Sequence, residues 1–94
     1  MHYQLSIRKI KESDLSVNRP SMPEDEDYEM YLSAFIEDVQ NLECVTKLVT
    51  NSNGLVITIE NESDFEQLHA AVKHLLNNSF HDKLVSDSGF SKVA

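Results

Sequence analysis

Two runs of β-branched residues joined by a short polar segment constrain the fold of this chain most strongly. Residues 44–50 read CVTKLVT, residues 55–59 read LVITI, and Asn51 to Gly54 between them read NSNG. Val, Ile and Thr favour strands, and Asn-Gly between two such runs is typical of a tight β-hairpin. The sequence therefore predicts two consecutive antiparallel strands.

The N-terminal residues 2–10 have the alternation of a half-buried strand. Tyr3, Leu5 and Ile7 alternate with polar residues before the pattern slips at residues 9–10, which predicts a first strand with one apolar face. The second strand of the hairpin alternates in the same way. We expect its residues to face the helices or the opposite side of the sheet as follows: Leu55, Ile57 and Ile59 inward, Val56 and Thr58 outward.

Two amphipathic helices are predicted, one on each side of the hairpin. The first covers residues 24–43 and begins near Pro23, because proline suits the first helical position, with Ser21 as its N-cap. The second covers residues 62–78, where Ser63 and Glu66 match the S-x-x-E pattern of a capping box. Apolar residues recur at helical spacing in both segments.

The predicted order is strand, helix, strand, strand, helix, which indicates an α+β fold. Ninety-four residues form a single domain over residues 1–94. Residues 11–23 are predicted as a long loop, residues 83–85 are the candidate fourth strand, and residues 87–94 are the candidate flexible tail. The order β-α-β-β-α(-β) is that of the ferredoxin-like or split βαβ arrangement, an antiparallel sheet with two helices on one face.

The first predicted helix is also the most acidic part of the chain. Residues 24–43 hold eight of the sixteen acidic residues and no Lys, Arg or His. Acidic residues in a first turn favour the positive end of the helix dipole, which accounts for two or three of them. The others give the helix one negative face, and the predicted partner-binding residues are Glu24, Asp25, Glu26, Asp27, Glu29, Glu37 and Asp38.

The net charge of −8 fits either a solubility device or a partner protein with a basic surface. Direct binding to nucleic acid or to an anionic membrane needs clustered Lys or Arg and is disfavoured. We therefore predict a non-enzymatic protein-binding module, an inhibitor or regulator that docks its acidic helical face on a basic, nucleic-acid-binding surface. A nucleic-acid mimic of the anti-restriction or anti-CRISPR type works in this way.

The alternative function is a homodimeric regulatory or scaffold domain that associates through its open sheet face. That face is predicted to be mixed in character rather than purely polar, so it is suited to a second copy of the chain or to another partner. The residues predicted on it are Gln4, Ser6, Arg8, Val56 and Thr58.

Patterns of catalysis and of cofactor binding are weak. Gly54 and Gly89 are the only glycines, so no glycine-rich nucleotide-binding loop can be written. His69 and His74 are five residues apart and point in different directions on a helix, and Cys44 is the only soft ligand. Cys44 also follows an acidic residue, which disfavours its thiolate. We therefore predict no metal, no cofactor and no enzymatic activity.

The single cysteine excludes an internal disulfide and fits a reducing, cytoplasmic setting. Residues 1–14 lack the apolar run of a signal peptide. No segment approaches the ~18 apolar residues of a membrane span. The sequence thus predicts a soluble cytoplasmic protein.

Overall fold

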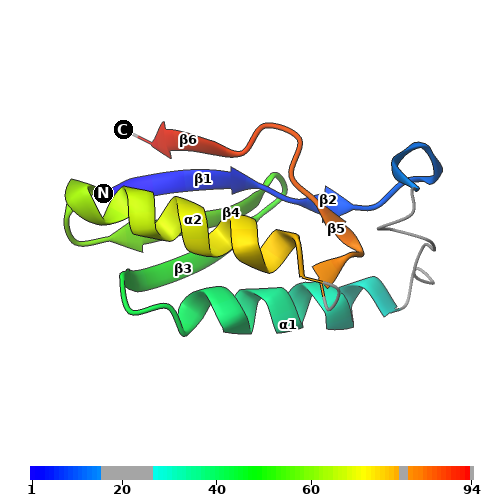
Figure 1. Ribbon diagram of the computed structural model, residues 1–94, viewed down its shortest axis with the longest axis horizontal. Coiled ribbons are helices and arrows are strands. Elements are labelled where there is room, and N and C mark those ends of the chain that lie inside the picture. The colour runs from blue at the N-terminus through cyan, green and yellow to red at the C-terminus, as the bar shows by residue number, and fades with distance from the viewer. Residues whose placement is uncertain (16–26, 79–80, 94) are drawn as a thin grey trace.

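The computed structural model is an α+β fold with a four-stranded antiparallel sheet, a small two-stranded sheet and two helices (Figure 1). The structure describes residues 1–15, 27–78 and 81–93. The strands are β1 (His2–Ser6), β2 (Arg8–Lys9), β3 (Val45–Asn51), β4 (Gly54–Ile59), β5 (Leu84–Val85) and β6 (Phe90–Val93). The helices are α1 (Tyr28–Gln40) and α2 (Phe65–Leu76), and single 3-10 turns cover Glu12–Asp14 and Glu62–Asp64.

The N-terminal strand occupies the centre of the main sheet, whose strand order is β3-β4-β1-β6. Leu5 of β1 lies opposite Leu55 of β4 on one side and opposite Phe90 of β6 on the other. The chain leaves this sheet after Ile7, whose N–H donates to the carbonyl of Asn53 at 3.2 Å, and continues as β2. The single strand predicted over residues 2–10 is therefore two strands in two different sheets.

One face of the main sheet is buried beneath both helices. Side chains that alternate along the central strands join those on the inner faces of the helices in one core cluster. Each of its main members is at most 5% exposed: Tyr3, Leu5, Leu55, Ile57, Ile59, Phe35, Val39, Leu68 and Val72. Burying one such large apolar side chain stabilises the fold by about 1.5–3 kcal/mol. The predicted inward face of β4 is confirmed, because Leu55, Ile57 and Ile59 are all buried.

The opposite face of the main sheet is more open. The predicted outward residues Gln4, Ser6, Val56 and Thr58 are all partly exposed. Arg8, which was predicted beside them, instead belongs to β2 in the small sheet, because the chain has already left the main sheet at that point.

The predicted hairpin is confirmed and has a two-residue connection, since Asn51 lies opposite Gly54. Gly54 also lies hard against the neighbouring strand. A Cβ atom at this position would come within 2.2 Å of the carbonyl oxygen of Leu5, and the φ angle of Gly54 is +137°. Only glycine therefore allows β4 to approach β1 this closely without strain.

The C-terminal residues correct the predicted fourth strand. Leu84–Val85 is a strand, but it pairs with Arg8–Lys9 in the small sheet. The fourth strand of the main sheet is Phe90–Val93, which lies within residues 87–94 where we predicted a tail. Without this strand, one edge of β1 would be free. Pairing with residues 90–93 satisfies the backbone N–H and C=O groups along that edge.

The helix boundaries also differ from the predictions. Helix α1 begins at Tyr28 rather than near Pro23, and both Pro23 and Ser21 lie outside the described residues, as does most of the predicted 11–23 loop. Helix α2 begins at Phe65 and has no side-chain cap. The predicted capping box is wrong because Ser63 lies inside the preceding 3-10 turn.

Among the residues that the structure describes, neither helix combines the length and apolar character needed to cross a membrane.

We predict that Gly54→Ala lowers the free energy of unfolding by more than about 2 kcal/mol, because the added methyl group meets backbone atoms of β1. Gly89→Ala is the matched control. Gly89 also has a positive φ of +62°, but a Cβ there meets no atom within 4 Å, so its cost should be about 1–2 kcal/mol. Urea denaturation of both variants checks this prediction, and equal losses would contradict it.

Candidate functional site

Exposed acidic residues lie near both ends of the described part of α1. Asp27, Glu29 and Glu37 are exposed along it, and Glu43 is exposed just beyond its end. None of these four carboxylates forms an ion pair within the described chain. The remaining predicted contacts Glu24, Asp25 and Glu26 lie outside the described residues.

An apolar side chain stands within this acidic face. Met30 is 60% exposed, and the exposed residues Ser33 and Ala34 follow it at helical spacing. Small residues next to an exposed methionine leave its flexible side chain accessible. Methionine adapts to irregular apolar recesses, so the face offers an apolar contact as well as negative charge.

Among the predicted contact residues that the structure describes, Asp38 alone has a side-chain partner within the protein. Its carboxylate is 2.7 Å from Nε2 of His81, whose side chain is 2% exposed, while that of Asp38 is 50% exposed. The His81 ring also packs edge-on against Phe35, with ring centroids 5.2 Å apart. The contact ties the end of α1 to the segment that precedes β5. Nδ1 of His81 is buried and has no hydrogen-bond partner among the described residues.

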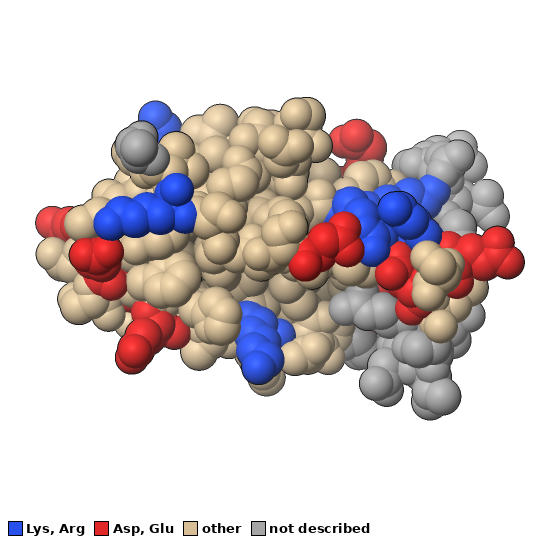
Figure 2. Space-filling model, turned by 90° about the horizontal axis from the view of Figure 1, so that it is seen from above, with Lys and Arg blue, Asp and Glu red and all other residues tan. Residues whose placement is uncertain are grey.

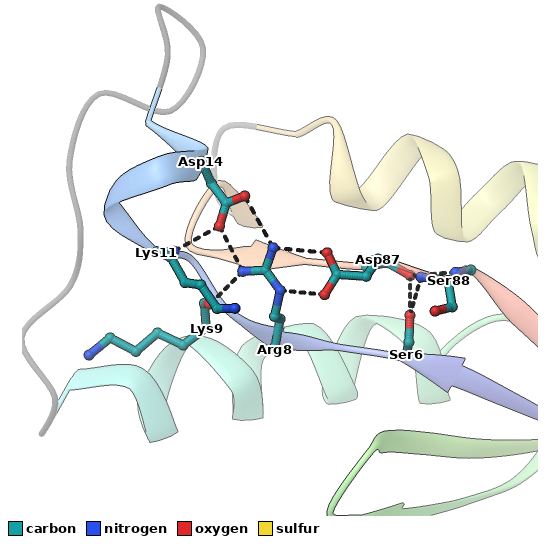
Figure 3. Close-up of polar contacts among 9 residues, drawn as sticks. Ser6, Arg8, Lys9, Lys11, Asp14, Asp87 and Ser88 are labelled. Carbon is teal, nitrogen blue, oxygen red and sulfur yellow. Dashed lines mark hydrogen bonds and ion pairs between the residues drawn. The ribbon is translucent and has the colours of Figure 1, made fainter.

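A second polar cluster centres on Arg8 and was not predicted from the sequence (Figure 3). The guanidinium binds Asp14 through two nitrogens at 2.7 and 3.1 Å, and it binds Asp87 through Nε and through Nη2 at 2.9 Å. Nη1 also donates to the carbonyl of Lys9 at 3.1 Å. All five N–H donors of an arginine are therefore engaged, and none remains for a ligand.

Serine hydroxyls extend this cluster into the connection between β5 and β6. The Ser6 hydroxyl lies 3.0 Å from that of Ser86 and accepts the backbone N–H of Ser88 at 2.9 Å (Figure 3). The backbone N–H of Ser6 donates to the carbonyl of Gly89 at 3.0 Å. The connection is thereby fixed against the end of β1.

The Arg8 pairs shift the titration of both carboxyl groups. The hydrogen bonds from Arg8, helped by the backbone N–H of Lys11, lower the pKa of Asp14 to about 2. The hydrogen bonds from Arg8 also lower the pKa of Asp87. Both groups remain ionised at neutral pH, and the charge of Arg8 compensates part of theirs.

Charge is distributed unevenly over the surface. None of the six described strands contains an Asp or Glu, so the acidic residues lie on the helices and connections. Seen from the side of the β6 edge, Lys and Arg gather with acidic side chains at the end that carries β2, and most of the middle of the face is uncharged (Figure 2).

The described residues offer little for catalysis or metal binding. No group of three or more His, Cys, Asp or Glu within the described ranges is arranged to hold a metal ion. Cys44 is buried, and its burial raises the pKa of the thiol, which disfavours the reactive thiolate.

The acidic helix follows from the sequence, but the contacts of Arg8 and His81 do not. Arg8 and Asp87 are 79 positions apart, and His81 and Asp38 are 43 positions apart. The one available signal was the turn sequence at residues 87–89, which marks a connection but not its partner.

No protein-family model, no curated protein and no solved structure matches this chain.

We predict that Arg8→Gln lowers the urea midpoint of unfolding at pH 7 and that this loss shrinks as the pH falls from about 4 to about 2. The folded-state pKa values of Asp14 and Asp87 lie below the usual carboxyl value. Their contribution to stability is therefore present above about pH 4 and is lost as the carboxyl groups protonate.

Arg8→Lys is the control for this experiment. Lysine keeps the charge but cannot bind two carboxylates in a planar fork, so its midpoint should fall between those of the wild type and Arg8→Gln. A loss that is constant from pH 7 to pH 2 would show that the Asp14 and Asp87 pairs do not carry the effect.

Proposed function

We propose that this chain is a non-enzymatic protein-binding module, an inhibitor or regulator that docks the exposed face of α1 on a basic surface of a partner protein. The observation that carries the proposal is that Asp27, Glu29 and Glu37 are exposed on or beside one helix and form no ion pair within the described chain. Exposed charges of one sign attract a complementary surface and speed the encounter.

The spacing of these charges supports docking on a nucleic-acid-binding surface. Asp27 and Glu29 form one pair of acids and Glu37 and Asp38 form another. At ~1.5 Å per residue, roughly 12 Å along the helix axis separates Glu29 from Glu37. Phosphates along one strand of duplex DNA are about 3.4 Å apart. A basic groove made for phosphates would therefore meet one pair of carboxylates near each end of α1, about three to four phosphate spacings apart, as it would in complex with an anti-restriction or anti-CRISPR type mimic.

Two further contacts would make the α1 face more than a diffuse negative field. The bond from His81 holds the Asp38 carboxylate at 2.7 Å, which lowers the side-chain entropy that this residue would lose on docking. Met30 supplies an exposed apolar group that suits a recess between basic side chains. The partner is accordingly a protein with a basic surface that contains an apolar pocket.

We predict that the triple variant Glu29→Gln, Glu37→Gln and Glu43→Gln weakens partner binding by at least about ten-fold, or ~1.4 kcal/mol. The partner is first captured from the native host on the immobilised chain and eluted with salt. Its affinity for wild type and variants is then measured by calorimetry at two salt concentrations, and wild-type affinity should fall as salt rises.

The control is the triple variant Glu12→Gln, Glu60→Gln and Glu66→Gln, which removes the same charge from exposed positions outside α1. It should bind within about two-fold of the wild type at physiological salt, where charges beyond ~8 Å are screened. Equal losses in both variants, or an affinity that salt does not change, would overturn the assignment of the α1 face.

A second candidate function, a homodimeric scaffold or regulatory domain, is favoured by the composition of the open sheet face. Val49 lies opposite Val56, and Val49 and Val93 are 48% and 39% exposed. Since the strands contain no acidic residue, two copies with a net charge of −8 each meet least repulsion there.

For the dimer we predict that Val56→Glu shifts the chain to monomers in light scattering at a series of concentrations, because it places a carboxylate on the open face. Thr50→Glu, which pairs with the inward residue Leu55 and so lies on the other face, should leave the dimer intact. A dissociation constant of ~1 mM corresponds to a dissociation free energy of about 4 kcal/mol. If the wild-type chain is still monomeric at that concentration, this function is eliminated.

We further propose that the fold is the ferredoxin-like or split βαβ arrangement and that the chain works in a reducing, cytoplasmic setting. The strand order β3-β4-β1-β6, with the β3–β4 hairpin between the two helices, supports the fold assignment. The single, buried thiol of Cys44 supports the setting.

A further inference from the structure

A cavity of about 420 Å³ lies between the second half of α2 and the connection from β5 to β6. This volume falls within the roughly 300–1,000 Å³ range of small-molecule sites. The cavity belongs to a different helix from the acidic α1 face, so an inference about it does not depend on the docking proposal.

The floor of this cavity is apolar and firmly packed. Leu5 of β1 and Val72 of α2 line it, and each is only 1% exposed. Phe90 of β6 also lines it, and its ring is held by Phe65 and His69 at centroid distances of 5.4 and 5.8 Å. A bound apolar group would therefore meet a surface that is already formed.

One side of the cavity is a row of hydrogen-bond donors from α2. His69, Lys73 and Asn77 line it and are four residues apart, so they lie on one side of the helix. Lys73 is exposed, and its ammonium forms no ion pair with any described residue. This side of the cavity therefore offers the positive charge of Lys73 next to the side-chain amide of Asn77.

The facing side contributes no free charge of its own. Asp14 lines it, but its carboxylate already accepts two bonds from Arg8 and one from the backbone N–H of Lys11. Ser86 adds a hydroxyl that is held by the backbone N–H of Gly89 at 3.2 Å. Lys73 is thus the one cation on the described lining that lacks a counter-ion.

We propose that this cavity binds a small amphipathic monoanion, a carboxylate with an apolar body. The carboxylate pairs with the Lys73 ammonium and accepts from the Asn77 amide, while the apolar body covers Leu5, Val72 and Phe90. A ligand with several negative charges is disfavoured, because Lys73 is the only Lys or Arg on the described lining and the chain carries a net charge of −8.

The test is an NMR titration of the full chain with 4-phenylbutyrate, using 4-phenylbutanamide as a neutral analogue of the same shape. We expect saturable shifts of the backbone amides of residues 72–77 and 85–90, with none over α1, and weaker binding of the neutral amide. No saturable shift with 4-phenylbutyrate up to ~10 mM, or equal affinities for the two compounds, would overturn the proposal.

Lys73→Met and Lys47→Met identify the cation. Both lysines are exposed and each substitution changes the net charge by the same amount, but Lys47 lies on β3, away from the cavity. Lys73→Met should weaken the binding of 4-phenylbutyrate about 2- to 5-fold, as expected for the loss of one exposed ion pair. It should leave the affinity for 4-phenylbutanamide unchanged. Equal effects of the two substitutions would refute the role of Lys73.

Discussion

The main sheet depends on pairing both edges of β1. Leu5 in the middle of this strand lies between Leu55 and Phe90, so the first strand of the chain is joined to one segment about fifty residues later and to another near its end. Contacts between such distant segments require large loops to close before they stabilise anything. Gly54 makes one of these contacts sterically feasible, and the strand alternation then buries one face of the sheet beneath both helices.

This burial explains where the charges lie. The inward residues of the strands must be apolar, and the outward residues of the described strands include no carboxylate. The acidic residues consequently lie on helices and connections, where water solvates them. Arg8 of β2 joins two of these connections, because it binds Asp14 in the turn after β2 and Asp87 between β5 and β6.

The Arg8 cluster also shapes the cavity beside α2. Asp14, Ser86 and Gly89 are held by Arg8 or by the serine bonds that adjoin it, and all three line the cavity. The cluster therefore fixes the facing wall against which a ligand on Lys73 would rest. Its own donors are saturated, so it contributes position rather than direct contact.

Local patterns in the sequence predicted the local features of the fold. The Asn51–Gly54 hairpin, the inward face of β4 and the two helices all follow from spacing within about twenty residues. Phe90–Val93 was missed because four residues at a sheet edge carry almost no periodic signal, and its strand character comes from β1. The failed capping box has a local cause, since a 3-10 turn around Ser63 moves the helix start to Phe65.

The candidate site shows the same division, since its local pattern was predictable from the sequence and its contacts between distant segments were not. The acidic face of α1 is a one-dimensional pattern, and Asp27, Glu29 and Glu37 are exposed as that pattern requires. The ordering of Asp38 by His81 and the donor row of His69, Lys73 and Asn77 beside Phe90 were not predictable, because each needs a partner from another part of the chain.

The two proposed uses of the surface are physically compatible. Helices and a sheet pack as layers about 10 Å apart, and the open sheet face lies on the side of the sheet away from both helices. At physiological ionic strength, charges more than about 8 Å apart are largely screened. If two copies met through their open faces, their α1 surfaces would point outward with little mutual repulsion, and a dimer would present two acidic helices to a basic partner. Self-association would then raise the affinity for a partner with two basic sites through effective concentration rather than through any new contact.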